Sequence, residues 1–247
     1  LLQAGYTGLV DALAAPLQIE TEAVVQQVVV EADRVTVHTQ DATWTGAHVI
    51  VTVPLGVLKA GSIDFEPDLP VEKTQAIERL DMGNLEKVVL VFDEPWWVDA
   101  GPLYFISAAG DGAWGAFLDL STTAGAPVLV AFTGGQFSRD TRASWTDADM
   151  VAGALGALEQ AHGHPIPEPV ATHVTRWTTD PFALGSYSYV AVGASPDDMD
   201  ALVEPVGERL QFAGEATYWR YHQTVHGAML SGLREAQRLA PEATVPG

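Results

Sequence analysis

The chain has 247 residues, enough for one large domain or two smaller ones with a buried core. Its 32 acidic and 12 basic residues give a formal net charge of −20, and it has no cysteine. This composition excludes disulfides and thiolate zinc sites, and it disfavours nucleic acid because phosphate binding needs clustered Lys and Arg. The acidic surface favours cationic small molecules, although solubility alone explains the same charge. The redox compartment stays open, with a cytoplasmic location as the default expectation.

The first third of the chain predicts alternating helices and strands. Apolar spacing predicts a helix over 8–17. Three β-rich runs separated by polar turns follow between 18 and 54. A short helix is predicted over 70–83, because the segment begins at a proline and ends at a glycine. A strand follows at 84–92.

The remaining segments continue the mixed pattern. Residues 102–135 alternate β-rich runs with glycine-containing turns, which predicts antiparallel sheet. Residues 146–163 predict a helix that begins at Thr and Asp and ends at a glycine. Residues 165–190 return to extended structure. The longest apolar runs are too short to cross a bilayer, so no membrane partner is expected.

A literal G-x-G-x-x-G match occurs at residues 110–115, GDGAWG. The dinucleotide fingerprint joins a strand to a helix whose amides meet a pyrophosphate, whereas here the extended run AFLDLS follows. We therefore expect a hairpin turn at this position and no phosphate-binding loop.

The stretch LQFAGEATYWRYHQTVHGAMLSGLREAQRL, residues 210–239, predicts a strand, a break at Gly214 and Glu215, and a helix from Thr224. Gly214 has no Cβ, which allows a ligand to approach the backbone. A helix N-terminus beside the break would stabilise negative charge on a bound group. Spacing alone leaves a second interpretation open, a helix packed on a sheet with no ligand.

Lys87 is unusual for its position in the strand at 84–92. It shares a strand face with Leu85, Val89 and Val91, so an apolar face carries an ammonium group. A lysine near a strand end that extends to water explains the same pattern.

Five stretches in order resemble the FAD-dependent amine oxidases, the family of monoamine oxidases, polyamine oxidases and flavin-dependent histone lysine demethylases. They are GYTGLVDALA (5–14), HVIVTVPLGVLKAGSIDFEPDLP (48–70), MGNLEKVVLVFDEPWW (82–97), RWTTDPFALGSYSYV (176–190) and FAGEAT with TVHGAMLSGLREA (212–236). The resemblance implies a mixed α/β fold. Part of a Rossmann-like FAD-binding domain would occupy 1–63 and 173–247. A substrate-binding domain with a mixed β-sheet flanked by helices would occupy 64–172.

The resemblance also implies a reaction and its partners. An amine would be oxidised to an imine by hydride transfer to FAD, and O2 would reoxidise the flavin to give H2O2. The family's G-x-G-x-x-G unit would lie upstream of residue 1, so we expect a second chain or an N-terminal segment to carry it. Polyamines, monoamines and amino acids stay open as substrates. The alternative is a non-catalytic binding or scaffolding module that keeps the fold.

Individual residues take roles from the same resemblance. Lys87 matches the catalytic lysine that holds a water against flavin N5. Trp177 and Tyr187 match side chains that line the substrate cavity, and Thr224 stands where several relatives place a second tyrosine. Without the resemblance, core packing explains these aromatic residues equally well. No metal is expected. The implied cofactor-binding residues are Val25, Thr52, Val53, Pro54, Trp177, Gly214, Glu215, Thr224 and Val225.

Overall fold

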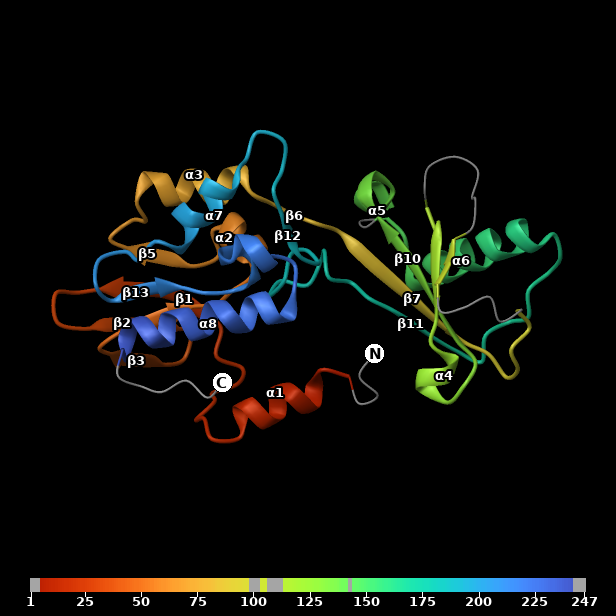
Figure 1. Ribbon diagram of the computed structural model, residues 1–247, viewed down its shortest axis with the longest axis horizontal. Helices are drawn as coiled ribbons and strands as arrows, with labels where there is room; N and C mark the ends of the chain where they lie inside the picture. The colour runs from red at the N-terminus through yellow and green to blue at the C-terminus, as the bar shows by residue number, and fades with distance from the viewer. Residues whose placement is uncertain (1–4, 98–102, 106–112, 142–143, 242–247) are drawn as a thin grey trace. The chain divides into compact units, whose positions relative to one another are not determined.

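The computed structural model of the chain is shown in Figure 1. It describes residues 5–97, 103–105, 113–141 and 144–241. The chain forms two compact units. Unit 1 consists of Leu1–Glu20 and Asn84–Thr178, and unit 2 consists of Thr21–Gly83 and Thr179–Gly247. The mixed α/β fold class predicted from the sequence is confirmed.

The two units divide the chain at different residues from those expected: residues 1–20 and 173–178 group with unit 1, and residues 64–83 group with unit 2. In this segment β5 (Asp64–Glu66) pairs in parallel with β1 (Val25–Val30). The next helix, α3 (Val71–Arg79), packs against α7 (Pro196–Val203). The predicted boundary after residue 172 falls inside β11 (Ala171–Val174), which belongs to the sheet of unit 1.

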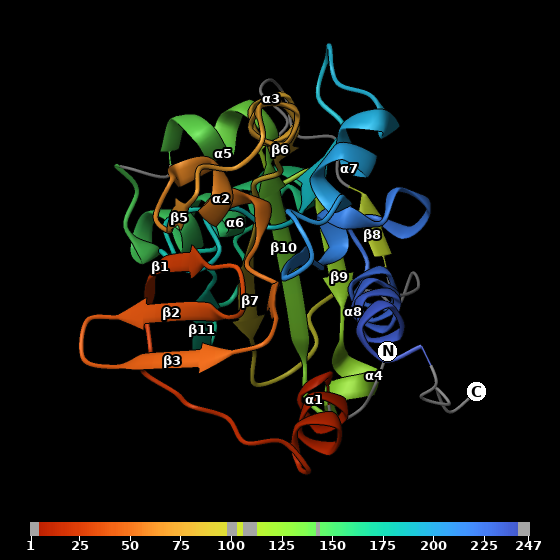
Figure 2. The same ribbon diagram turned by 90° about the vertical axis from the view of Figure 1, so that its left-hand side faces the viewer.

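The described residues of unit 2 form three sheets. The largest has the strand order β3-β2-β1-β5, and Figure 2 shows β1, β2 and β3 side by side. The other two are the parallel pair β13-β4 and the antiparallel pair β12-β6. Four strands therefore occupy the region where three β-rich runs were predicted. The remaining strand bounds are β2 (Val35–Thr39), β3 (Thr43–Gly46), β4 (Val49–Val51), β6 (Asp81–Met82), β12 (Ser188–Tyr189) and β13 (Leu210–Phe212).

The predicted C-terminal helix of unit 2 is confirmed as α8 (Val225–Leu239). Two short 3-10 turns precede it, η1 (Glu215–Thr217) and η2 (Trp219–Tyr221). Two further helices of unit 2, α7 and α2 (Leu55–Ala60), were not predicted from the sequence. A core of valines together with Leu210 and Phe212 joins the large sheet to the parallel pair. This core fixes the ends of β4 and β13.

In the described part of unit 1, five strands form a sheet with the order β11-β7-β10-β9-β8, and every neighbouring pair is antiparallel. The predicted antiparallel middle region is confirmed. Of the G-x-G-x-x-G match, residues 110–112 lie outside the described residues, while Ala113 and Trp114 form a turn that leads into β9. The strand bounds are β7 (Leu85–Val91), β8 (Leu103–Phe105), β9 (Ala116–Asp119) and β10 (Val128–Gly134).

The helices of unit 1 are α1 (Thr7–Ala14), α4 (Ser121–Ala124), α5 (Gly135–Thr141) and α6 (Asp147–His162). The predicted helix at 146–163 is confirmed as α6. Thr146 and Asp149 form a reciprocal capping box at its start, and Gly163 ends it in the left-handed conformation. Within the described part of the chain, no helix has the length and apolar character needed to cross a membrane.

Candidate functional site

Two parallel strands of unit 2 end beside one another. β4 and β13 pair with Val51 opposite Phe212, and the Ala213 amide donates to the Val51 carbonyl at 2.9 Å. The segment Thr52–Pro54 leaves the first strand and Gly214 leaves the second. The carboxyl ends of parallel strands are where α/β proteins bind ligands. The structure therefore brings the predicted cofactor-binding residues of these two segments together.

Gly214 has a backbone that few other residues adopt. Its φ of +132° lies in the region that favours glycine. Its amide donates to the Ser231 hydroxyl of α8 at 2.8 Å, and its carbonyl accepts from the Thr217 hydroxyl at 2.8 Å. A Cβ built on Gly214 would have one close neighbour, the Thr52 carbonyl oxygen at 3.9 Å. The backbone is thus firmly held and its Cβ side is open, which fits the close approach of a flat cofactor.

Glu215 is bound by three donors of its own chain. Its Oε1 accepts from the Ser188 amide at 2.9 Å. Its Oε2 accepts from the Ser188 hydroxyl at 2.8 Å and from the Gln223 amide at 2.7 Å. The carboxylate therefore connects β12, η1 and the segment that leads into α8.

Tyr187 lies next to this connection. Its half-buried ring packs on Gly83, where an added Cβ would come within 2.8 Å of the ring. The Gly83 amide donates to the Tyr187 carbonyl at 2.6 Å. Since the following residue, Ser188, binds Glu215, the predicted substrate-binding and cofactor-binding residues of unit 2 share one hydrogen-bonded framework.

The N-terminus of α8 is capped by Thr224. Its hydroxyl accepts from the Gly227 amide at 3.0 Å and donates to the Tyr221 carbonyl at 2.6 Å. The first amides of a helix have no acceptor within the helix, so Val225 presents its amide at the positive end of α8. Its side chain is 49% exposed. The last predicted cofactor residue, Val25, is half-buried at the start of β1 and packs on the core beneath β4 and β13.

Unit 1 carries the other two predicted residues on neighbouring segments. Along β7, Lys87 and its neighbours at every second position are half-buried, which confirms the predicted shared face. The Lys87 amide donates to the Thr175 hydroxyl at 2.8 Å, and the Thr175 amide donates to the Lys87 carbonyl at 3.0 Å. Trp177 follows two residues after Thr175 and is 44% exposed.

Glu86 is a residue that the sequence analysis missed. It is 3% exposed, on the opposite face of β7 from Lys87, and it accepts hydrogen bonds from Thr175, Trp177 and Thr178. The available signal was the alternation in LEKVVLV, which places this carboxylate on the same buried face as Val88 and Leu90.

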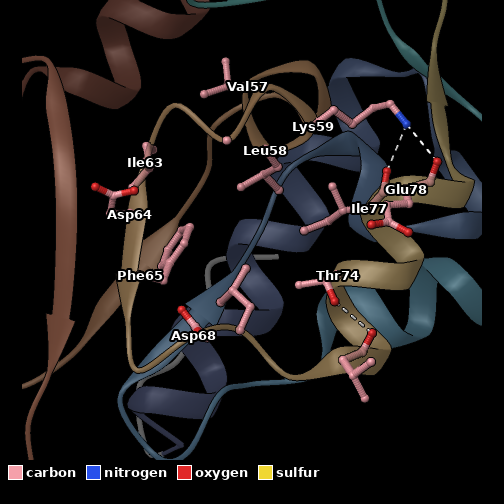
Figure 3. Close-up of a pocket in the computed structure, with 13 residues that line it drawn as sticks. Val57, Leu58, Lys59, Ile63, Asp64, Phe65, Asp68, Thr74, Ile77 and Glu78 are labelled. Atoms are coloured by element: carbon pink, nitrogen blue, oxygen red, sulfur yellow. Dashed lines mark hydrogen bonds between the residues drawn. The ribbon is translucent and has the colours of Figure 1, made fainter.

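Unit 2 also has a pocket of about 580 Å³, shown in Figure 3. Apolar side chains from α2, β5 and α3 line it, including Leu58, Phe65 and Ile77. At one side, the Lys59 ammonium donates to the carbonyls of Ile77, Glu78 and Leu80 and so caps the end of α3. None of the predicted site residues lines this pocket. Within unit 2, the candidate site is therefore the strand edge described above, where Thr52–Pro54 and Gly214 converge.

Comparisons with known proteins identify the family of the chain. A family model described as flavin containing amine oxidoreductase matches residues 1–240. Lysine-specific histone demethylase 1 homolog 1 of Oryza sativa subsp. japonica is 40% identical over 246 residues, covering 97% of this chain and 29% of that protein. Protein FLOWERING LOCUS D of Arabidopsis thaliana is 40% identical over 252 residues, covering 100% of this chain and 32% of that protein. The chain thus spans about a third of the length of these relatives.

Among solved structures, cyclohexylamine oxidase from Brevibacterium oxydans IH-35A matches with a TM-score of 0.73 and 26% identity. The match covers 90% of this chain and 48% of that one. The predicted family and cofactor are therefore confirmed. The chain belongs to the flavin containing amine oxidoreductase family, whose members depend on FAD.

Proposed function

We propose that this chain takes part in the oxidation of an amine to an imine, with O2 reduced to H2O2. FAD, when bound, would supply the redox chemistry, a two-electron oxidation of the amine at the carbon next to nitrogen coupled to the reduction of O2 to H2O2. The observation that carries the proposal is the convergence of Thr52–Pro54 and Gly214 at the ends of two parallel strands. Together with the family match, this convergence supports a flavin site on this chain.

The residues of unit 2 provide the binding surface. The open side of Gly214 admits the cofactor, and the framework around Glu215 keeps this turn in place. The Val225 amide at the positive end of α8 would stabilise negative charge on the flavin pyrimidine carbonyl. Tyr187 would present an aromatic face to the amine, which attracts a cation or orients an apolar substituent.

Lys87 would act on the redox step rather than on cofactor binding. The resemblance assigns it to the neighbourhood of flavin N5, where its ammonium would favour the negative charge that the cofactor gains on reduction. We further propose that a second chain or a further N-terminal segment provides the phosphate-binding glycine loop. The net charge of −20 favours a cationic amine as substrate, such as a polyamine or a lysine side chain.

The test uses the natural full-length protein, purified with all of its associated chains. We expect a yellow protein with flavin absorbance that releases peroxide when an amine is added. A colourless protein that does not bind added FAD would overturn the proposal and favour a non-catalytic scaffolding module.

Lys87→Met provides the site-specific version of this test. FAD should stay bound, while reoxidation by O2, followed by stopped-flow absorbance, slows by about 100-fold because one electrostatic contribution is lost. Lys59→Met is the charge-matched control, since Lys59 binds the carbonyls at the end of α3, and it should keep the wild-type rate. Wild-type reoxidation in Lys87→Met would remove this residue from the mechanism.

A further inference from the structure

The buried carboxylate of Glu86 receives four hydrogen bonds from a segment that is distant in sequence. Its Oε2 accepts from the Thr175 hydroxyl at 2.7 Å and from the Trp177 amide at 3.1 Å. Its Oε1 accepts from the Thr178 amide and the Thr178 hydroxyl, both at 2.9 Å. Two donors on each oxygen fix both the position and the orientation of the carboxylate.

The Thr175 hydroxyl connects this network to Lys87. It donates to Glu86 and at the same time accepts from the Lys87 amide at 2.8 Å. The Glu86 carboxylate therefore holds the Trp177 segment directly and is linked to Lys87 through the Thr175 hydroxyl. Such anchoring holds the backbone positions from which the half-buried Lys87 and the exposed Trp177 extend their side chains.

Arg176, between the anchored residues, is held from another direction. Its Nε donates to Asp147 at 3.0 Å, and its Nη2 donates to the Trp145 carbonyl at 3.1 Å. Each residue from Thr175 to Thr178 thus has a defined polar partner. The backbone of Trp177 has little freedom to shift along β7.

We propose that Glu86 is a positioning residue for the amine oxidation, because it holds the Trp177 backbone in register with Lys87. This inference rests on the proposed function, in which both residues serve the flavin and its substrate. Without the carboxylate, four partly buried donors lose their acceptor and the segment moves to find other partners. Displacements of about 1 Å near reacting groups lower rates by about 100-fold.

The experiment compares Glu86→Ala and Glu86→Gln with the wild-type holoenzyme. Gln keeps one acceptor oxygen for two of the four donors, so it should retain part of the function. Anaerobic flavin reduction by an amine should slow by about 100-fold in Glu86→Ala and by about 10-fold in Glu86→Gln. The matched control is Thr133→Val, which replaces the residue opposite Glu86 on β10 and should reduce at the wild-type rate. Its buried hydroxyl has no hydrogen-bond partner among the described residues.

A second readout is independent of the flavin. Amide hydrogen exchange of Trp177 and Thr178 should accelerate in both Glu86 variants and stay unchanged in Thr133→Val. Unchanged exchange in the Glu86 variants would overturn the inference, and so would faster exchange with a wild-type reduction rate. If the wild type oxidises no amine, the proposed function fails. The exchange rates then still decide whether Glu86 anchors Trp177.

Discussion

Lys73 shows how this fold places a charged group in its interior. The residue is 2% exposed, and its ammonium donates to the Ala201 carbonyl at 3.1 Å and to the Leu202 carbonyl at 2.5 Å. These carbonyls belong to the last turn of α7, and the ammonium also lies 4.1 Å from the centre of the Phe212 ring. Burial lowers the pKa of Lys73 from 10.5 to about 8, against the opposing influence of nearby glutamates.

This shift predicts a rise in stability at alkaline pH. Between about pH 8 and pH 10.5 the unfolded chain keeps the Lys73 proton while the folded chain has lost it, so the free energy of unfolding increases with pH. Urea unfolding at two pH values in this window should show a contribution on the order of 1 kcal/mol. In Lys73→Met that contribution should disappear.

Lys59→Met is the control for this pH effect, because Lys59 also caps a helix with its ammonium but is exposed. It should keep the wild-type pH slope. An equal slope in Lys73→Met and the wild type would show that Lys73 is not the group responsible.

At the residue scale, alternation along β7 was enough to predict the face of Lys87. The same alternation contained Glu86 one position earlier, but its four donors come from residues about 90 positions later in the chain. No local pattern encodes such a pairing. The contacts of Glu215 with Ser188 were unpredictable for the same reason, although the break at Gly214 was visible in the sequence.

At the element scale, helices with strong local signals were the predictable ones. The capping box of Thr146 and the terminal Gly163 define α6 without help from the rest of the fold. The predicted helix at 70–83 ends earlier, at Arg79, because Asp81–Met82 pairs with β12. At this point the pairing of β6 with β12 ends the helix, although the apolar spacing would allow it to continue. The unpredicted α7 also has a readable capping box, at Ser195.

Two glycines of α8 look equivalent in the sequence and differ in the structure. A Cβ on Gly227 would lie 1.9 Å from the Tyr221 carbonyl oxygen, whereas a Cβ on Gly232 would meet nothing within 4 Å. Gly227→Ala should therefore destabilise the protein by about 1–3 kcal/mol, because backbone must move. Gly232→Ala should stabilise it by about 0.5–1 kcal/mol, because alanine favours the helix.

Chemical denaturation of the two variants checks this pair directly. Each glycine serves as the control for the other, since both lie in the same helix. Equal effects of the two substitutions would contradict the close approach of Gly227 to Tyr221.

At the scale of the whole molecule, the family and the fold class could be predicted because ordered motifs span nearly the entire chain. The two compact units differ from the domain division that the resemblance implies. Each unit is assembled from two separate stretches, and the deciding contacts, such as β5 on β1 and α3 on α7, join residues far apart in sequence. Composition shifts along the chain do not report such contacts.

The whole-molecule prediction concerns linkage between cofactor binding and folding. A ligand that binds only the folded state stabilises it, by about 2.7 kcal/mol at 100 times its Kd. Added FAD should therefore raise the thermal midpoint of the flavin-free full-length protein in a concentration-dependent way. ADP, which has the adenine end without the flavin ring, should raise it less. An unchanged midpoint with FAD would favour the scaffolding alternative.

The single carboxylate of Glu215 has one more implication. Its oxygens accept hydrogen bonds from the amides of Ser188 and Gln223 at the same time, so three separate backbone segments meet at one side chain. These three segments share one acceptor group, the Glu215 carboxylate. A change in any one of these three segments therefore alters the acceptor that the other two share, so the turn that follows β13 depends on all of them.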